Sequence, residues 1–434
     1  MPSQKLQQKF NKVQSNFRKY EEIPEDWNLK TLNEIGKVSG GGTPDTKEKK
    51  YWGGKIRWAI PSDLTNLEKN FIENTERTIT QLGLDESSAN LFKPGTILLS
   101  SRATVGVCKI NTVPMATNQG FQNIECNESF DNLYVLYSIQ YNKIKLIRYA
   151  FGTTFLEISK NNVKKVKLAC PEFPEQQKIA SILSNTDDSI QKTTEQLEKT
   201  KQLKTGLMQK LLTKGIGHTK FKETIFGPRF LRIQIPKDWE CDLLENHSDV
   251  HVGHVGPTSE YYCDDGVVFL RTQNVRENMP DLADVLHITR QFHLEHKKSQ
   301  LLPKDILVSR VGNSGVACVI PDDFPEANCA NVLILRKKES LDTKFFCYFL
   351  NSHIAQLEIT SREAGGVQLV LNVKTLEKLS IPILPLEEQQ KIASILSNAD
   401  SQIESLQSKK SQLQKTKRGL MQKLLTGKIR VPLN

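Results

Sequence analysis

The chain has 434 residues, of which 38% are hydrophobic and 25% are charged; this composition predicts two or three folded domains and excludes an intrinsically disordered chain. It has no apolar run near the roughly 18 residues that cross a bilayer, and its polar start, MPSQKLQQKFNK, predicts no signal peptide. The net charge of +10 favours a polyanionic partner such as nucleic acid, and the eight cysteines, with no pair at metal-ligand spacing, predict free thiols in a reducing cytoplasm.

Residues 1–20 carry apolar side chains at intervals of four and three positions. These side chains are Leu6, Phe10, Val13 and Phe17. Because this spacing places them on one side of an α-helix, it predicts an amphipathic helical segment ahead of the first globular region.

The first globular region, residues 21–172, contains a stretch in which cations alternate with aromatic residues, SGGGTPDTKEKKYWGGKIRWAIPSDL. Long cationic side chains suit phosphates, aromatic rings suit exposed bases, and glycines permit close backbone approach. The alternative is a solvated loop, and Trp58, in an alternating apolar run, is predicted to belong to the core. The residues predicted to contact DNA here are Gly42, Thr43, Lys50, Tyr51, Arg57, Ser62, Arg102, Thr104 and Asn118.

Residues 173–215 have the pattern of one long amphipathic helix. From Leu183 to Leu211, apolar side chains and threonines recur at alternating spacings of four and three, the a/d pattern of a coiled-coil seam. The only proline is Pro174, which the first turn of a helix tolerates. A helix of about 40 residues is roughly 60 Å long.

The second globular region, residues 216–385, has a polar and basic cluster but lacks the GGTP and YWGG motifs of the first. Arg271-Thr-Gln-Asn274 follows an apolar strand, and arginine pairs with guanine, whereas asparagine and glutamine pair with adenine, in the major groove. The residues predicted to contact DNA here are His254, Thr258, Tyr261, Arg271, Gln273, Asn274, Arg276, Arg310, Asn313 and Asn331.

Signatures of catalysis on nucleic acid are missing or weak. The sequence has no GxxxxGK[ST] phosphate loop, no Asn-Pro-Pro-aromatic methyltransferase motif and no zinc-ligand spacing, so neither a catalytic residue nor a metal site is predicted. Asp281, Glu295 and Lys297 match the loose PD…ExK pattern of metal-dependent nucleases. The second segment, QFHLEHKK, does not have the alternating pattern of the strand that this chemistry requires.

Residues 386–434 contain a second long helix whose sequence repeats the first. The segment EQQKIASILSN occurs at Glu175–Asn185 and at Glu388–Asn398, and GLMQKLLT occurs at Gly206–Thr213 and at Gly419–Thr426. Both repeats are offset by the same 213 positions. The chain is therefore a tandem duplication in which the helices stayed alike while the globular regions diverged.

The two helices have complementary seams. Where the first has Thr193 and Thr200, the second has leucines, which predicts that they pack on one another as an intramolecular antiparallel coiled coil. The alternative is two independent surface helices, one on each domain. The predicted seam residues are Leu183, Ile190, Leu197, Leu207, Leu396, Ile403, Leu406, Leu413 and Leu420.

Three functions fit one helical scaffold with two diverged domains, and the basic charge favours the first. A reader of two DNA half-sites at a fixed separation would have this organisation. A bivalent adaptor for two protein ligands would also have it, and would need no basic surface. A nuclease would use Asp281, Glu295 and Lys297, and would cleave DNA with a divalent metal and without a partner.

The repeated motifs and the organisation resemble the specificity subunit of type I restriction–modification systems over the whole chain. Residues 173–215 and 386–434 resemble its two conserved regions, residues 21–172 and 216–385 its two target recognition domains, and GGTP…YWGGKIRW the start of a common recognition domain. The resemblance implies an α+β fold in which two globular α/β domains are separated by two long antiparallel helices. It also implies a circular pseudo-twofold symmetry, in which residues 1–20 pack near the second conserved region.

The resemblance further implies a cytoplasmic, non-catalytic subunit that binds double-stranded DNA. Each recognition domain would read one half of a bipartite, asymmetric site, and the helices would set the spacer. The helices would also bind two modification subunits that methylate adenine, and restriction subunits with translocase and endonuclease activity would join them. The chain would hold no cofactor, because S-adenosylmethionine and ATP with Mg²⁺ would bind to the partner subunits.

Overall fold

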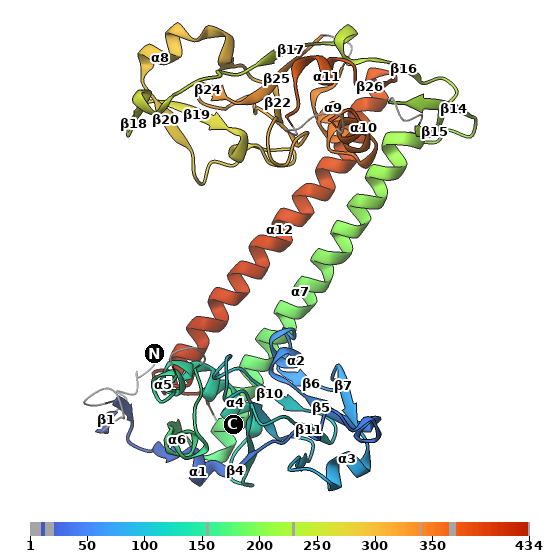
Figure 1. Ribbon diagram of the computed structural model, residues 1–434. Coiled ribbons are helices and arrows are strands. Elements are labelled where there is room, and N and C mark those ends of the chain that lie inside the picture. The colour runs from blue at the N-terminus through green and yellow to red at the C-terminus, as the bar shows by residue number, and fades with distance from the viewer. Residues whose placement is uncertain are drawn as a thin grey trace. The chain divides into compact units, whose positions relative to one another are not determined.

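The computed structural model describes residues 10–13, 21–152, 156–227, 231–338, 341–363 and 370–432. The chain forms two compact units, in which the blue-to-green and yellow-to-orange globular regions of Figure 1 lie. Unit 1 comprises Met1–Glu195 and Gln407–Asn434, and unit 2 comprises Gln196–Leu406. The division falls inside both long helices, so each unit holds one globular region with part of each helix.

Unit 1 is built on two small sheets. Their strand orders are β4-β12-β9-β10-β6 and β7-β5-β11-β8. Strands β5 and β11 run parallel, with Ala59 opposite Thr117, so both end at the same edge. The strands are β1 Phe10–Val13, β2 Glu21–Pro24, β3 Asn28–Thr31, β4 Gly36–Gly40, β5 Trp52–Ala59, β6 Phe71–Ile72, β7 Arg77–Ile79, β8 Leu91–Phe92, β9 Ile97–Leu99, β10 Cys108–Asn111, β11 Met115–Thr117, β12 Gln122–Cys126 and β13 Lys167–Cys170. The short helices are α1 Leu32–Ile35, η1 Lys49–Tyr51, α2 Pro61–Thr65, α3 Gln81–Asp85, α4 Asn132–Tyr141, α5 Lys143–Arg148 and α6 Lys160–Lys165.

Unit 2 repeats most of this topology despite its different sequence, with one strand fewer in the first sheet and one more, β18, in the second. Its sheets have the orders β17-β25-β22-β23 and β18-β20-β19-β24-β21, and β19 and β24 form the parallel pair, with Arg271 opposite Ala330. The strands are β14 Phe221–Phe226, β15 Leu231–Pro236, β16 Glu240–Leu243, β17 Ser248–Val252, β18 Tyr262–Cys263, β19 Val267–Arg271, β20 Leu286–Ile288, β21 Gln300–Leu301, β22 Ile306–Ser309, β23 Ala317–Val319, β24 Ala327–Ala330, β25 Val332–Lys337 and β26 Ser380–Ile383. The short helices are η2 Leu244–Asn246, η3 Ser259–Tyr261, η4 Thr272–Asn274, α8 Arg290–Glu295, η5 Lys297–Ser299, α9 Thr343–Leu350, α10 His353–Glu363 and α11 Val373–Glu377. The duplication read from the helices therefore extends to the globular regions.

The two long helices are α7, Phe173–Lys214, and α12, Leu386–Leu424. The predicted seam residues are all buried or half-buried, whereas most of their neighbours along each helix are exposed. No helix among the described residues is long and apolar enough to span a membrane.

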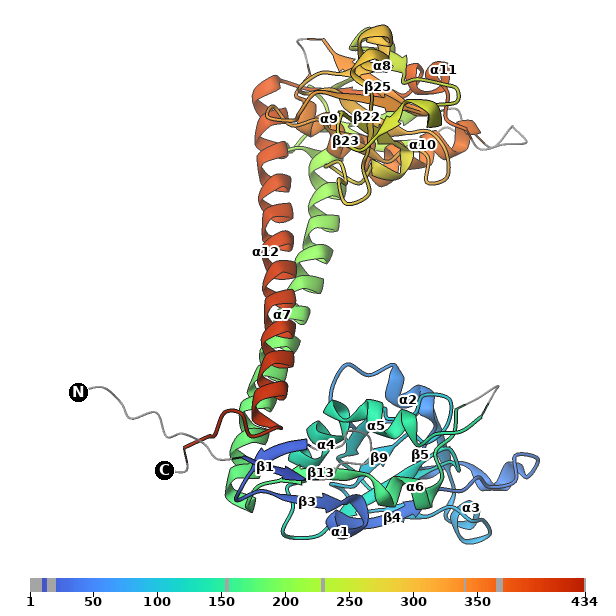
Figure 2. The same cartoon turned by 90° about the vertical axis from the view of Figure 1, so that its left-hand side faces the viewer.

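Each unit packs the start of one long helix beside the end of the other. Figure 2 shows α7 and α12 near the globular region of unit 1. One core there contains Ile179 and Leu183 from α7 together with Leu424 from α12. In unit 2 the equivalent repeat positions, Ile392, Leu396 and Leu211, share one core. The helices therefore support both globular regions, and the alternative of two independent surface helices is wrong.

Ion pairs in unit 1 show that its two helix segments run antiparallel. In unit 1, Asp187 pairs with Lys417, and Glu175, earlier in α7, pairs with Arg430, which follows α12. The residue number therefore rises on one side as it falls on the other, as the predicted antiparallel arrangement requires.

The predicted N-terminal helix is wrong where the structure describes it. Phe10 and Val13 lie in strand β1, which pairs antiparallel with β2, whereas Leu6 and Phe17 lie outside the described residues. The hairpin β14–β15 has the same place in unit 2, with Phe221 opposite Pro236 as Phe10 is opposite Pro24. A strand partner, which helical spacing does not reveal, decides the conformation.

A contact between distant segments closes unit 1. Arg430 forms ion pairs with Asp26 (2.6 Å) and with the buried Glu175 (2.7 Å), and Glu175 also accepts a hydrogen bond from Trp27 Nε1 (3.3 Å). The residues after α12 therefore pack beside Asp26 and Trp27, just after β2, whereas most of residues 1–20, predicted to pack near the second conserved region, lie outside the described residues.

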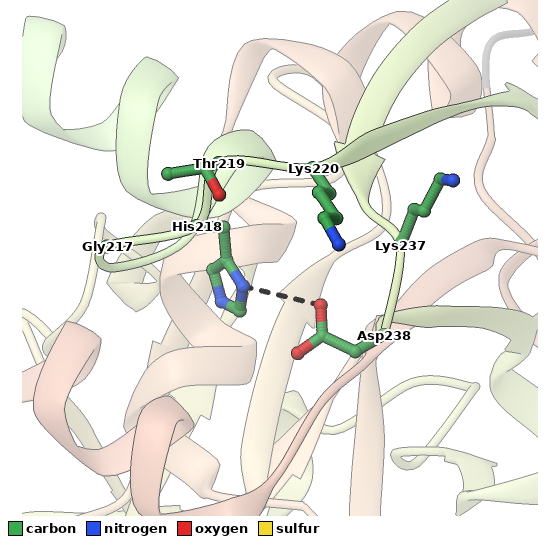
Figure 3. Close-up of a pocket in the computed structure, with 6 residues that line it drawn as sticks. All are labelled: Gly217, His218, Thr219, Lys220, Lys237 and Asp238. Carbon is green, nitrogen blue, oxygen red and sulfur yellow. Dashed lines mark ion pairs between the residues drawn. The ribbon is translucent and has the colours of Figure 1, made fainter.

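The equivalent contact in unit 2 uses a histidine in place of the arginine. His218 lies 2.9 Å from Glu388 and 3.3 Å from Asp238, and Figure 3 shows the latter pair. Trp239 Nε1 donates to Glu388 (3.1 Å), as Trp27 does to Glu175. The same joint therefore fastens the first residues of each globular region to a long helix.

Candidate nucleic-acid interface

In unit 1, the loops at the ends of the parallel strands line a pocket of about 220 Å³. Two predicted DNA-contact residues, Arg102 and Asn118, are among its lining residues, with Gln119 between Asn118 and Gly120. A third, Thr43, donates a hydrogen bond to Gln119 Oε1. The exposed Ser62 follows Pro61, which also lines this pocket.

Sequence reasoning missed Gln119. It is exposed and directly follows Asn118 in a polar run after an apolar strand, the same signal that singled out Gln273. Arg102 is also exposed, with its guanidinium 3.9 Å from Glu157, and Thr104 forms a 2.8 Å hydrogen bond with Ser100 in the same loop. The pocket therefore presents amide and guanidinium groups, which match the hydrogen-bonding edges of bases.

Lys50, Tyr51 and Arg57 do not line this pocket. Lys50 is exposed and lies 5.4 Å from the centre of the Tyr51 ring on η1, and Arg57 on β5 donates to Asn74 Oδ1 (3.3 Å). The structure therefore spreads the unit 1 candidates over the pocket, η1 and the middle of β5.

Trp58 is a core residue, as predicted: it is 3% exposed, and its indole donates to the Gly42 carbonyl (2.9 Å). Gly42 is also buried, and a Cβ atom there would lie 2.3 Å from the backbone of Ser88. The close approach that this glycine permits is therefore to the chain itself, so its prediction as a DNA contact has a structural explanation instead.

In unit 2, hydrogen bonds bring several candidates together at the end of the parallel pair β19–β24. The backbone N–H of Asn331 donates to the backbone carbonyl of His254 (3.1 Å), and Thr272 Oγ1 donates to the backbone carbonyl of Asn331 (2.7 Å). Next to Thr272, the Arg271 guanidinium donates to the Asp284 backbone carbonyl (3.4 Å), and the Gln273 side-chain amide donates to the Asp284 carboxylate (3.0 Å).

Asn274 has a different role from the one predicted. It is 2% exposed, its Oδ1 accepts from the Arg271 amide, and its Nδ2 donates to the Asp281 carbonyl. A buried amide with these backbone partners holds the loop in place and does not reach the surface. Arg276, by contrast, is exposed and lies 3.5 Å from the Asp281 carboxylate.

An aromatic group adjoins this edge. The His254 ring lies 5.0 Å from Phe292 and 4.7 Å from His296, and Tyr261 lies 4.8 Å from Phe292. Burial, and then the charge of His296, lowers the pKa of His254, so its ring is neutral at neutral pH. Thr258 is 9% exposed and forms a 2.7 Å hydrogen bond with the Tyr262 hydroxyl, so its hydroxyl is already engaged.

Arg102 and Arg310, which follow the corresponding strands β9 and β22, are not structural equivalents. Ser100 and Ser309 make the same backbone bonds, so Arg310 corresponds to Ser101, and Val311 corresponds to Arg102. Arg310 Nε donates to the Leu371 carbonyl (3.1 Å), whereas Arg102 faces solvent. Asn313 is exposed in the loop after Val311.

Asn118 and Asn331, in contrast, occupy the same place. Each directly follows the second strand of the parallel pair, opposite the end of the first strand. Both units therefore present an asparagine and a neighbouring glutamine, Gln119 or Gln273, at one equivalent edge.

The nuclease pattern does not form a metal site. Asp281 lies in a loop and Glu295 ends helix α8, where it accepts from Gln291 Nε2 (2.9 Å), so the two carboxylates are not on adjacent strands. In the part of the chain that the structure describes, no group of three His, Cys, Asp or Glu side chains can hold a metal.

Comparison with known proteins agrees with this arrangement. Residues 24–202 and 236–415 match the family described as the type I restriction modification DNA specificity domain. The chain is 31% identical to the type I restriction enzyme MjaIX specificity subunit of Methanocaldococcus jannaschii over 418 residues, which cover 94% of this chain and 95% of that protein. The MjaVIII specificity subunit of the same organism is 27% identical and covers 94% of each chain.

Solved structures show the same fold. The S subunit of the type I restriction–modification system from M. genitalium has a TM-score of 0.58 at 14% identity, covering 94% of this chain and 97% of that one. The two family matches coincide with the two globular regions and extend into the long helices. The chain therefore belongs to the family of type I restriction–modification DNA specificity subunits.

Proposed function

We propose that each globular region reads one half of a bipartite, asymmetric DNA site, and that α7 and α12 set the spacer between the halves. The observation that carries this proposal is the equivalent edge of the two parallel strand pairs. One fold presents Asn118 and Gln119 in unit 1 and Asn331 with Arg271 and Gln273 in unit 2. The shared place supports a shared mode of DNA contact, and the different side chains support two different half-sites.

The electrostatics support DNA as the ligand. The formal net charge is +10, and exposed cations such as Lys50, Arg102 and Arg276 lie on both units. Arg102 and Arg276 each lie near a surface carboxylate, and such pairs contribute little stability. DNA phosphates can therefore replace these carboxylates as partners of the two arginines at a small cost in free energy. Affinity should therefore fall steeply with salt.

The long helices support two copies of one protein partner. Within the repeated segment EQQKIASILSN, several identical positions are exposed in both copies, where packing inside the chain does not require identity. They are Gln177, Lys178, Ser181 and Asn185 in α7 and Gln390, Lys391, Ser394 and Asn398 in α12. A surface repeated in this way suits two identical partners, which we infer to be modification subunits.

In this proposal the chain recognises DNA and catalyses nothing by itself. S-adenosylmethionine would bind to the modification subunits, and ATP with Mg²⁺ to restriction subunits that join the complex. The eight cysteines are all free thiols, and burial raises the pKa of Cys108 to about 12 and the pKa of Cys318 to about 12. Unreactive thiols of this kind suit a reducing compartment, so we assign the protein to the cytoplasm.

Adenine methylation of a randomised DNA library tests the proposal. The full chain is assembled with its modification subunit and S-adenosylmethionine, and methylated molecules are sequenced. The proposal predicts one motif of two short halves with a fixed gap. Methylation without sequence preference, or binding of protein partners alone, would reject it in favour of the adaptor.

A further inference from the structure

A polar cluster joins the globular region of unit 1 to both long helices. Its centre is Asp187 on α7, whose Oδ2 accepts from the Tyr137 hydroxyl on α4 (2.7 Å) and from Asn70 Nδ2 (2.8 Å). Lys417 Nζ, on α12, lies 2.6 Å from Asp187 Oδ1. Gln140 Nε2 donates to Asn70 Oδ1 (2.9 Å) and completes the cluster, which we name anchor 1.

Unit 2 contains the same cluster with the helices exchanged. Asp400, on α12, accepts from the Tyr348 hydroxyl on α9 (2.7 Å) and from Asn278 Nδ2 (3.2 Å), and it pairs with Lys204 Nζ on α7 (2.5 Å). Asn351 Nδ2 donates to Asn278 Oδ1 (3.2 Å), as Gln140 does to Asn70. We name these five residues anchor 2.

The sequences around the anchors have diverged far more than the anchors themselves. Along the ten residues of α4, the aligned residues of unit 2 are identical only at the anchor tyrosine. Packing alone does not demand a hydroxyl there, because the buried Tyr134, one turn earlier, is replaced by Phe345 in unit 2. The retained chemistry therefore points to the hydrogen bond that the tyrosine makes.

The anchors are shielded enough for their bonds to hold a definite geometry. Tyr137 is fully buried, and the side chains of Lys417 and Asp187 are only 21% and 25% exposed. Burial, and then the hydrogen bond to the carboxylate, raises the pKa of Tyr137 and of Tyr348, so both hydroxyls keep the proton that they donate. Charge-assisted bonds in such a setting are stronger and less screened by salt than surface pairs.

Each anchor also lies close along the chain to a predicted DNA contact. Asn70 precedes Asn74 by four residues, and Asn74 holds the Arg57 guanidinium. Asn278 follows Arg276 by two residues. Each anchor therefore ties a recognition loop, a globular helix and both long helices to one carboxylate.

We propose that the two anchors are positioning sites that hold each recognition region at one angle against its helices and so determine which spacer length the chain accepts. The inference rests on the proposed function, because a spacer has meaning only for a bipartite site. A region that turns about its helix segments moves its base-contacting edge. Loss of an anchor should therefore widen the range of accepted spacers while leaving the preferred bases of each half unchanged.

The test uses the full chain assembled with its modification subunit and the two-part site found for the wild type. Methylation rates are measured with the native spacer and with spacers one base pair shorter and longer. Tyr137→Phe and Tyr348→Phe should each lower the preference for the native spacer by about tenfold, the factor expected for one hydrogen bond to a charged group. The matched control is Tyr134→Phe, on the same helix α4 as Tyr137. This variant loses a 2.7 Å hydrogen bond to the Ala169 backbone carbonyl and should keep the preference for the native spacer.

Thermal unfolding separates positioning from a loss of folding. If Tyr137→Phe does not fold, Lys417→Gln removes the ion pair of anchor 1 without changing the core and should give the same relaxed spacing. Anchor variants that unfold earlier but keep the wild-type spacer preference would overturn the inference and leave the proposed function intact. A wild-type complex that enriches no two-part site would overturn the proposed function, and the inference with it.

Discussion

At the scale of single residues, the candidate DNA contacts already have partners within the chain. Arg57 donates a hydrogen bond to Asn74, and Arg271 and Gln273 both donate to Asp284. Such bonds orient the side chains before a ligand arrives, which reduces the entropy lost on binding. Recognition of each half-site should therefore depend on a small number of oriented side chains.

Alanine at Arg57 or at Arg271 should weaken recognition of one half-site and leave the other intact. The expected loss is about 1–3 kcal/mol of binding free energy at the affected half, because a bidentate base contact is removed. Binding to sites mutated in one half or the other measures it. Arg232→Ala, an exposed arginine on β15, is the control. Equal loss on every sequence would instead assign the arginine to phosphate.

The Arg430 joint makes a separate prediction about stability. Arg430→Ala should lower the free energy of unfolding by about 2–3 kcal/mol, because the Glu175 carboxylate, which is 2% exposed, loses a charge-assisted partner. Arg418→Ala, at an exposed position of α12, should change it by no more than about 0.5 kcal/mol. Urea unfolding at neutral pH measures both variants, and equal effects would contradict the prediction.

This stability difference should also depend on pH. The Arg430 hydrogen bond lowers the pKa of Asp26 from its ordinary 3.8 in the folded chain. A lowered folded pKa stabilises the protein above the unfolded pKa, and the effect is lost as pH falls through the folded value. The gap between wild type and Arg430→Ala should therefore be constant near neutral pH and shrink below about pH 5. A gap that stays constant on acidification would show that Asp26 does not contribute to it.

At the scale of elements, much of the fold could be predicted from the sequence because the long helices have a regular spacing of apolar residues. Spacings of four and three identified α7 and α12, and the repeat identified the duplication. The same spacing misidentified residues 10–13, because pairing of β1 with β2 depends on a tertiary partner. Lys204 and Lys417 interrupt the apolar seam, and their partners, Asp400 and Asp187, lie off the seam where spacing gives no signal.

The candidate site was less predictable than the helices. Residue type and position after a strand located the edge that holds Asn118 and Asn331. They did not distinguish a side chain that faces solvent, such as Arg276, from one that supports a loop, such as Asn274. That distinction depends on hydrogen bonds between segments distant in sequence, which no local pattern encodes.

The repeated exposed face of each long helix predicts the stoichiometry of the complex. Ser181→Arg should remove one of two modification subunits, and Ser394→Arg the other, because each adds a bulky charge to one copy of that face. The double variant should bind neither, with folding unchanged because both positions are exposed. Native mass spectrometry measures the result, and two bound copies on the double variant would place the partner elsewhere.

At the scale of the whole molecule, one duplicated plan explains both units. Each has two sheets built around a parallel strand pair, a tryptophan-to-glutamate contact at the start of a long helix and the same anchor, whereas the edges that carry the candidate contacts differ. The repeated helix segments and most of the anchor residues were retained, whereas most of the candidate contact residues diverged. This is the arrangement expected of a chain that reads two different sequences with one fold.

The most direct test of this account is a domain exchange. Residues 21–172 are replaced by the first recognition region of a relative with a known different site, and the methylated motif is determined with the modification subunit present. One half of the motif should change, while the other half and the spacer stay as they were. A change in both halves, or no change in either, would contradict the claim that each globular region reads one half-site.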